Sequence, residues 1–155
     1  MTPAINVLKK TKVAYKIHEY THSASAESYG LEAAEKMNVP QEQVFKTLVV
    51  KLNNDQLAVG IVPVAGMLSM KYMAKSLGAK KAEMAKPIDV ERSTGYILGG
   101  VSPLGQKKRL KTVIDSSAKN SDRIYVSAGK RGLDIELSPL DLNKLVNGIF
   151  ADISQ

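Results

Sequence analysis

The sequence predicts a mixed α/β (α+β) fold in one domain spanning residues 1–155, with a curved, barrel-like sheet covered by helices. A chain of 155 residues, 44% of them hydrophobic, is long enough to bury a real core as one domain. Segments with a strand pattern outnumber those with a helical pattern, and most connections are too short for repeated parallel crossovers. Together these features favour a curved mixed sheet over a parallel array.

The first forty residues predict two short helices around one strand. A Thr-Pro pair at the start is typical of the N-cap and first turn of a helix, here over 3–10. The alternating AYKIHEY segment predicts a strand over 14–20, and the polar segment behind it predicts a loop over 21–29. A brief helix over 31–37 follows, ended by an Asn-Val-Pro sequence.

A hairpin comes next, built on the segment QVFKTLVVKL at 43–52. Apolar side chains occur on both alternating faces of this segment, which is typical of a central strand covered on both sides. An Asn-Asn-Asp turn then leads into QLAVGIV at 56–62, which predicts an antiparallel partner strand closed by Pro63.

The second half of the chain predicts three more helices and a series of short strands. Ser69 can cap a helix over 67–77, which Gly78 ends. The other two helices begin at prolines, over 87–93 and 139–146. Strands are expected at 80–85, 110–115, 123–127, 133–137 and 149–153.

Composition excludes several classes of protein. There is no Cys, which excludes disulfides, thiolate metal sites and a cysteine nucleophile. No apolar run approaches the length of a membrane span and no signal-peptide pattern opens the chain, so we expect a cytoplasmic protein that does not associate with membranes. The net charge of +7 indicates a polyanionic partner, although such an excess can also serve solubility alone.

Lys46 is the residue of the hairpin that most needs an explanation. By alternation it shares a face with Val44, Leu48 and Val50, so its ammonium group has no local partner. Burying an unpaired charge is costly, and the group must therefore pair, reach a cleft or lose its proton. A lysine that merely extends to water at a strand edge is the structural alternative.

The second candidate is the glycine loop GGVSPLG at 99–105. Its three glycines allow positive φ and a close approach of a ligand to the backbone, and Pro103 stiffens it. Such a loop can present N–H groups to an oxyanion or a phosphate. It is not a P-loop, because Gln106 stands where Lys is required, and it is not a nucleophile elbow, because Ser102 is followed by Pro-Leu. An ordinary tight connection is the alternative interpretation.

A basic cluster follows the glycine loop directly. It consists of Lys107, Lys108 and Arg109, with Lys111 two positions further on. Four positive charges at this place can grip a phosphate backbone. Most charge runs are solvated faces, which is the alternative here.

Histidines and paired carboxylates give weaker signals. His18 and His22 have the spacing of a helical metal site, but on a strand this spacing places them far apart, so we expect structural roles. Asp134 and Glu136 point the same way on LDIEL, which predicts an exposed strand face more readily than an acid/base pair.

Several segments together make the chain similar to a known family. The VFKTLVV around Lys46, the STGY before the glycine loop, GGVSPLGQKKR itself and YVSAGKRGLDIEL resemble the YbaK/ProX family of aminoacyl-tRNA deacylases. The start TPAINVLKK and the AAEKMNV helix also fit, so the resemblance covers essentially the whole chain.

The resemblance implies an editing enzyme that hydrolyses the ester between a mischarged amino acid and the 3′-terminal adenosine of tRNA, without metal or organic cofactor. Lys46 matches the essential lysine of the family, and Gly100 and Val101 are expected to stabilise the oxyanion or to bind the adenosine. The substrate-binding residues implied in this way are Tyr20, Tyr29, Gly99, Ser102, Pro103, Ser127 and Asp134. The tRNA-binding residues implied are Lys107, Lys108, Arg109 and Lys111.

The expected substrate is Cys-tRNA(Pro), with Cys-tRNA(Cys) as a second, and the expected chemistry is attack by the substrate's own thiol on its ester carbonyl. The acceptor end of tRNA(Pro) and prolyl-tRNA synthetase are the expected partners. Two alternatives stay open: a deacylase of the same fold that is specific for Ala-tRNA(Pro) or another small amino acid, and a non-catalytic module that binds tRNA or a synthetase.

Overall fold

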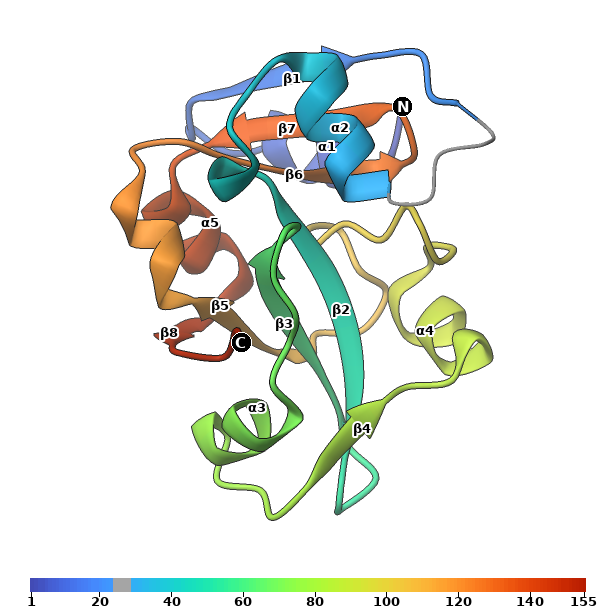
Figure 1. Cartoon of the computed structure of the whole chain (residues 1–155). Helices are drawn as coiled ribbons and strands as arrows, with labels where there is room; N and C mark the ends of the chain where they lie inside the picture. The colour runs from blue at the N-terminus through green and yellow to red at the C-terminus, as the bar shows by residue number, and fades with distance from the viewer. Residues whose placement is uncertain (24–28) are drawn as a thin grey trace.

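The structure is a computed structural model that describes residues 1–23 and 29–155 (Figure 1). It contains one sheet of three strands and one of five, with short helices packed around them. This arrangement confirms the predicted mixed α/β class. Of the loop predicted at 21–29, residues 24–28 lie outside the described residues.

The five-stranded sheet carries the predicted hairpin at its centre. Its strands, in spatial order, are β4 (Ala82–Met84), β2 (Phe45–Leu52), β3 (Leu57–Pro63), β5 (Lys111–Asp115) and β8 (Ile149–Ala151). The β2–β3 and β2–β4 pairs are antiparallel, whereas β3–β5 and β5–β8 are parallel. The turn between β2 and β3 places Asp55 at a φ of 66°, a left-handed conformation that Asp tolerates better than most residues.

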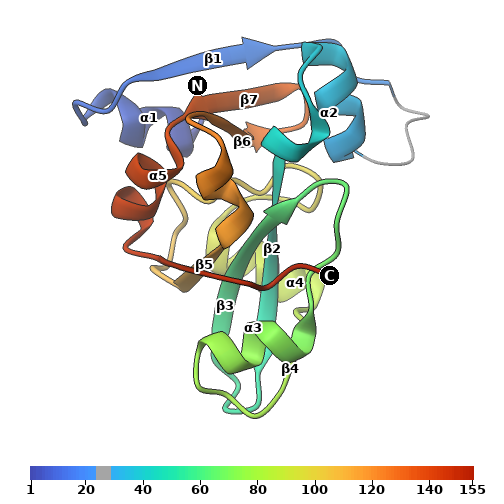
Figure 2. The same ribbon diagram turned by 60° about the vertical axis from the view of Figure 1, so that its left-hand side comes forward.

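The three-stranded sheet is antiparallel throughout and lies at one end of β2 (Figure 2). It consists of β1 (Tyr15–Glu19), β7 (Leu133–Leu137) and β6 (Ile124–Lys130), in that order. Within the described part of the chain, the one β-bridge that joins the two sheets is the isolated pair of Val44 and Tyr125. Because the hydrogen-bonded ladder does not continue past this bridge, the sheets do not close, and the predicted barrel-like shape is wrong.

The helices are short, and side-chain caps set where several of them begin. They are α1 (Pro3–Lys9), α2 (Tyr29–Met37), α3 (Met70–Ser76), α4 (Pro87–Thr94) and α5 (Pro139–Val146), with 3₁₀ turns η1 (Gln41–Gln43) and η2 (Ser116–Asn120). Ser69 caps α3 by accepting from the Tyr72 N–H at 3.1 Å, as predicted. The helix nevertheless starts at Met70 rather than at residue 67, because Met67 and Ser69 hydrogen-bond through their backbones to the C-terminal segment.

The core is divided by the five-stranded sheet. The larger part fills the space between the two sheets and includes Phe45, Ile61, Ile135 and Leu142. A smaller part, around Met73, lies between α3 and the other face of the five-stranded sheet. A third group joins α2 to the outer face of β6 and so covers one side of the three-stranded sheet. No helix in the described part of the chain is long and apolar enough to cross a membrane.

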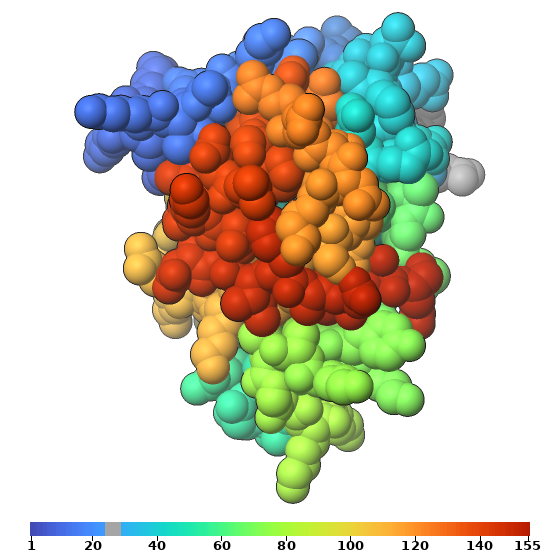
Figure 3. Space-filling view, turned by 90° about the vertical axis from the view of Figure 1, so that its left-hand side faces the viewer, coloured from blue at the N-terminus to red at the C-terminus, as the bar shows by residue number. Residues whose placement is uncertain are grey.

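Asp115 attaches the C-terminal segment to the rest of the fold. Its buried carboxylate accepts hydrogen bonds from the backbone N–H groups of Ile153 and Ser154, both at 3.0 Å, and from Ser117. Figure 3 shows the segment that it holds, in dark red, running across one face of the molecule above α3. Burial raises the pKa of Asp115, but the hydrogen bonds outweigh burial, so this pKa lies below its usual value.

Replacing Asp115 tests this attachment. Because the native pKa of Asp115 is depressed, its contribution to stability is present above pH 4 or so and is lost as the pH falls through the native pKa. We expect Asp115→Asn to lower the free energy of unfolding by about 2 kcal/mol at pH 7 and by less in acid. Urea unfolding across this pH range, with exposed Asp122→Asn as the control, measures the effect. An equal loss at both ends of the range would contradict it.

Candidate active site

A half-open cavity of about 280 Å³ lies where α2, the start of β2, the glycine loop and the β6–β7 hairpin meet. Its wall brings together segments that lie far apart in the chain. The lining residues include Tyr20, Tyr29, Thr47, Lys46, Leu98, Gly99, Val101, Ser127, Lys130, Arg131 and Asp134. Of the site residues predicted from sequence, seven lie on this wall: Lys46, Val101, Tyr20, Tyr29, Gly99, Ser127 and Asp134.

Lys46 reaches this cavity from β2. Its side chain is half-buried on the strand, opposite Val62 in the β2–β3 register. None of the ion pairs among the described residues involves it. Burial lowers the pKa of Lys46 below its usual value, because the charged form loses hydration that no neighbouring carboxylate replaces. The structure therefore presents an unneutralised amine to the cavity.

Asp134 contributes a carboxylate from the opposite wall. It is 6% exposed, and within the described residues no hydrogen bond or ion pair reaches its carboxylate. Burial raises the pKa of Asp134 to about 7. Tyr20 lies on the same wall, and burial together with the charge of Asp134 raises the pKa of this phenol to about 12. The predicted exposed strand face is wrong here, since α2 covers this side of the sheet.

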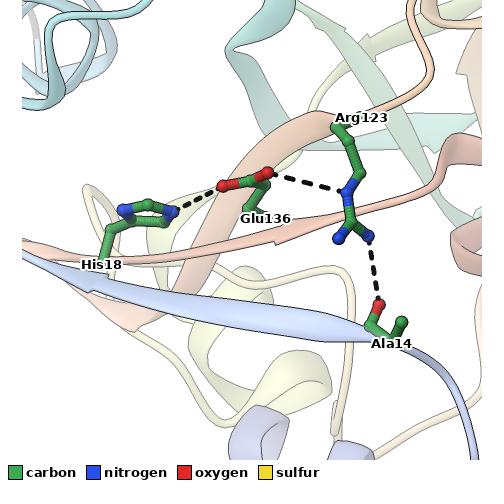
Figure 4. A network of polar contacts seen from close by, with 4 residues as sticks. All are labelled: Ala14, His18, Arg123 and Glu136. Carbon is green, nitrogen blue, oxygen red and sulfur yellow. Dashed lines mark hydrogen bonds and ion pairs between the residues drawn. The ribbon is translucent and has the colours of Figure 1, made fainter.

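Glu136, two residues along β7, contrasts with Asp134 because it is fully partnered (Figure 4). One carboxylate oxygen lies 2.7 Å from His18 Nε2, and the other lies 3.6 Å from Arg123 Nε. Arg123 also donates to the Ala14 carbonyl at 3.5 Å, and the edge of the Tyr125 ring meets His18. This network ties β1, β6 and β7 together beside the cavity. Its saturation with partners makes Asp134 the carboxylate that remains available for a ligand.

The glycine loop closes against Tyr29 and the β6–β7 turn. Gly99 has a φ of +93°, and a Cβ there would lie 2.3 Å from the Tyr29 ring. A Cβ on Gly100 would lie 2.9 Å from the Lys130 Cα. Both positions therefore require glycine. The Gly100 N–H already donates to Ile97 at 3.0 Å, whereas no acceptor among the described residues takes the Val101 N–H.

Two loop residues predicted to bind substrate are buried and do not lie on the cavity wall. Ser102 is fully buried, and its hydroxyl accepts from the Leu104 N–H at 3.2 Å. Pro103 is buried beside it and lines a different cavity. The buried Tyr96 donates to the Leu104 carbonyl at 2.6 Å. These contacts fix the shape of the loop.

The basic cluster lies outside the Lys46 cavity. Lys107, Lys108 and Arg109 line a second cavity of about 290 Å³, bounded by α1 and α5. Lys111 is exposed at the start of β5. The backbone N–H groups of Lys107 and Lys108 bond to the end of α4, which leaves their side chains in solvent.

Sequence reasoning missed Arg131, whose guanidinium lies 3.8 Å from the Tyr29 ring centroid and pairs with Glu32 at 3.2 Å. Its buried Nε has no hydrogen-bond partner among the described residues, and neither has Thr47 Oγ1. Both residues line the Lys46 cavity. Buried polar atoms are rarely left unpaired, so these two atoms distinguish this wall of the cavity. The only signal in the sequence was the Lys-Arg-Gly turn within the segment that carries the family resemblance.

Comparison with known proteins identifies the class to which this fold and site belong. A family model for the aminoacyl-tRNA editing domain matches residues 25–145. The chain is 41% identical over 156 residues to a protein of Enterococcus faecalis named "Putative Cys-tRNA(Pro)/Cys-tRNA(Cys) deacylase EbsC", covering 99% of this chain and 93% of that protein. It is 29% identical over 124 residues to YwhH of Bacillus subtilis, covering 80% of this chain and 76% of YwhH.

Solved structures share the fold at low sequence identity. The crystal structure of hypothetical protein APE2540 has a TM-score of 0.88 at 22% identity and covers 99% of this chain and 100% of that one. A "putative trans-editing enzyme for prolyl tRNA synthetase" has a TM-score of 0.84 at 21% identity and covers 100% of this chain and 99% of that one.

The chain therefore belongs to the aminoacyl-tRNA editing domain family. It is accordingly a hydrolytic deacylase of aminoacyl-tRNA, and the resemblance to the YbaK/ProX family is confirmed.

Asp134 offers a test of the cavity's electrostatics. A carboxyl whose native pKa is raised to about 7 destabilises the fold as the pH rises from about 4 to 7, because the unfolded chain releases the proton first. We expect Asp134→Asn to raise the free energy of unfolding by about 3 kcal/mol at pH 8 and to change it little at pH 4. Urea unfolding at both pH values measures this difference.

The matched control is Glu136→Gln on the same strand, which removes the negative charge that pairs with Arg123 and leaves only one acceptor oxygen for His18 and Arg123, and should destabilise the protein at pH 8. An Asp134→Asn variant that is no more stable than wild type at pH 8 would show that the carboxylate is paired or hydrated in the native state.

Proposed function

We propose that this deacylase cleaves Cys-tRNA(Pro), and also Cys-tRNA(Cys), at the ester that joins cysteine to the terminal adenosine. The observation that carries the proposal is the amine of Lys46, which has no ion-pair partner among the described residues and lies in a small, half-open cavity. The name of the Enterococcus faecalis relative, at 41% identity, supports the choice of substrate.

Charge complementarity supports the same substrate class. The 3′ end of an aminoacyl-tRNA carries an α-ammonium group on the amino acid and negative phosphates beyond the ribose. The cavity offers the Asp134 carboxylate and the Lys46 amine, which do not neutralise each other. We assign Asp134, with Tyr20 and Ser127, to the aminoacyl group, and Lys46 to the ribose and phosphate end.

The glycine loop would stabilise the charge that develops on the ester oxygen. We assign this role to the amides at Gly100 and Val101, of which Val101 has an N–H that no acceptor in the described part of the chain takes. Gly99 would let the loop approach the substrate closely. The buried Ser102 and Pro103 would help to fix the shape of the loop from within.

The proposed chemistry needs no nucleophile from the protein. The thiol sulfur of the substrate cysteine attacks its own carbonyl carbon, a C–S bond forms, and the C–O bond to the ribose breaks. The thiol proton ends on the released ribose hydroxyl, so the products are tRNA and a thiolactone, which water then opens. The protein would contribute positioning and oxyanion stabilisation. A chain without Cys is compatible with this division of labour.

The rest of the tRNA would be held mainly through its phosphates. We assign this contact to Lys107, Lys108, Arg109 and Lys111, which are exposed. Phosphate contacts position a nucleic acid without reading its sequence, so tRNA selection calls for a partner, for which we propose prolyl-tRNA synthetase. Such an enzyme would act in the cytoplasm, where its substrate is made.

Replacing Lys46 tests the site. We expect Lys46→Ala to lower the single-turnover rate of Cys-tRNA(Pro) deacylation by about a hundredfold, a typical effect of removing one electrostatic contact to the reacting group. The control is Lys51→Ala on the same strand, whose side chain pairs with Asp55 at 3.4 Å, and which should retain full activity. Circular dichroism checks the fold of both variants.

A non-catalytic binding module would give the opposite pattern. Lys46→Ala would then leave function intact, while charge reversal at Lys107 and Lys108 would abolish it.

The amino acid tests the chemistry. Because a hydroxyl is a much weaker nucleophile than a thiol, Ser-tRNA(Pro) should react far more slowly than Cys-tRNA(Pro), by a hundredfold or so, and Ala-tRNA(Pro) should be inert. Deacylation of the three charged forms of one tRNA measures this order. Comparable rates for Cys and Ser would contradict thiol attack, and cleavage of Ala-tRNA(Pro) with Cys-tRNA(Pro) spared would identify an alanine-specific enzyme.

A further inference from the structure

We propose that the terminal adenine of the aminoacyl-tRNA stacks on Tyr29 at the rim of the Lys46 cavity, with Leu98 on its other side and Arg131 as the positioning residue behind the tyrosine. This inference rests on the proposed function in one respect only: it takes an aminoacyl-tRNA 3′ end as the occupant of the cavity.

The size of the cavity directs the base to the rim. About 280 Å³ is slightly below the usual range for pockets that enclose a drug-sized ligand. An aminoacyl-adenosine is as large as a drug-sized ligand, so the cavity encloses only part of it. We place the aminoacyl group and the ribose in the interior. The base, which extends from the ribose away from the ester, therefore lies where the cavity opens.

Tyr29 provides the platform at this opening. It is the first residue of α2, lines the cavity and is 43% exposed. Arg131 lies over the ring at 3.8 Å from its centroid, and the backbone of Gly99 abuts one ring edge. These two neighbours leave Tyr29 partly exposed, and we infer that a planar base covers the ring face opposite Arg131.

Arg131 holds the platform in place. Its guanidinium is fixed by Glu32 at 3.2 Å and by the carbonyl of Ser23. A cation against one face of an aromatic ring is favourable, and a base added to the other face would complete a three-layer stack. Because Arg131 belongs to the β6–β7 turn and Tyr29 to α2, this contact also sets the distance between two walls of the cavity.

Leu98 supplies the opposing surface from the glycine loop. It lines the same cavity and is 56% exposed, and its neighbour Ile97 is 72% exposed. Large apolar side chains left in water beside a functional cavity indicate that a ligand covers them. Stacking between an aliphatic and an aromatic side chain holds any base without reading its identity, which suits a substrate whose last nucleotide is always adenosine.

A fluorescent RNA tests the stack without requiring catalysis. The probe is an RNA minihelix ending in CCA, with 2-aminopurine in place of the terminal adenine and cysteine attached to the 3′ end through an uncleavable amide. Stacking quenches 2-aminopurine, so wild-type protein should quench the probe as it binds. We expect Tyr29→Ala to abolish the quenching and raise Kd about tenfold, and Tyr29→Phe to behave like wild type.

The other two residues should give graded results with the same probe. Leu98→Ala should reduce the quenching in part. Arg131→Ala should reduce the quenching as well, and Arg131→Lys, which keeps the charge but not the planar group, should restore it only partly. The matched control is Tyr72→Ala on α3, an exposed tyrosine (45%) remote from the cavity lining, which should change neither quenching nor Kd.

Retained quenching in both Tyr29→Ala and Leu98→Ala, with folded protein and bound probe, would overturn the inference. If Leu98→Ala altered only the stimulation of cleavage by a synthetase and left quenching intact, Leu98 would be a protein contact instead. Wild-type protein that cleaves Cys-tRNA(Pro) but does not quench the bound probe rejects the stack alone. Wild-type protein that quenches the probe but leaves Cys-tRNA(Pro) intact rejects the proposed substrate and keeps the stack.

Discussion

The site depends on two charged side chains that share one cavity without pairing. Lys46 and Asp134 both line it. Burial lowers the pKa of Lys46 and raises the pKa of Asp134, and each shift favours the neutral form. Within the described part of the chain, neither residue takes part in an ion pair. Desolvating an unpaired charge destabilises a fold. We propose that the protein keeps both groups for a ligand whose two ends carry opposite charges, which would compensate for the hydration that burial removes.

The surrounding fold keeps these groups in position and separate. β2 carries Lys46 close to the Val44 bridge between the two sheets, and the residue lines the cavity that lies there. The neighbouring carboxylate, Glu136, is saturated by His18 and Arg123 and does not compete for Lys46. The glycine loop approaches because Gly99 and Gly100 leave no side chain to obstruct Tyr29 or the β6–β7 turn.

Sequence patterns correctly predicted the structural features that depend only on residues close together in the chain. The Ser69 cap, the hairpin around Asp55 and the isolated charge of Lys46 on an apolar strand all follow from neighbours within a few residues. The environment of Asp134 could not be predicted in this way, because strand alternation does not say which sheet face a distant helix covers. Arg131 was missed for the same reason, since its importance lies in contact with Tyr29, about one hundred positions earlier in the chain. Closure of a barrel likewise depends on contacts between strands far apart in sequence.

A crystal structure with a cysteinyl-adenosine mimic, its ester replaced by an amide, tests the central claim most directly. The account predicts the cysteinyl group beside Asp134, the amide carbonyl oxygen within hydrogen-bond distance of the Val101 N–H, and the Lys46 amine at the ribose. A mimic bound instead in the cavity between α1 and α5, with the Lys46 cavity empty, would contradict it.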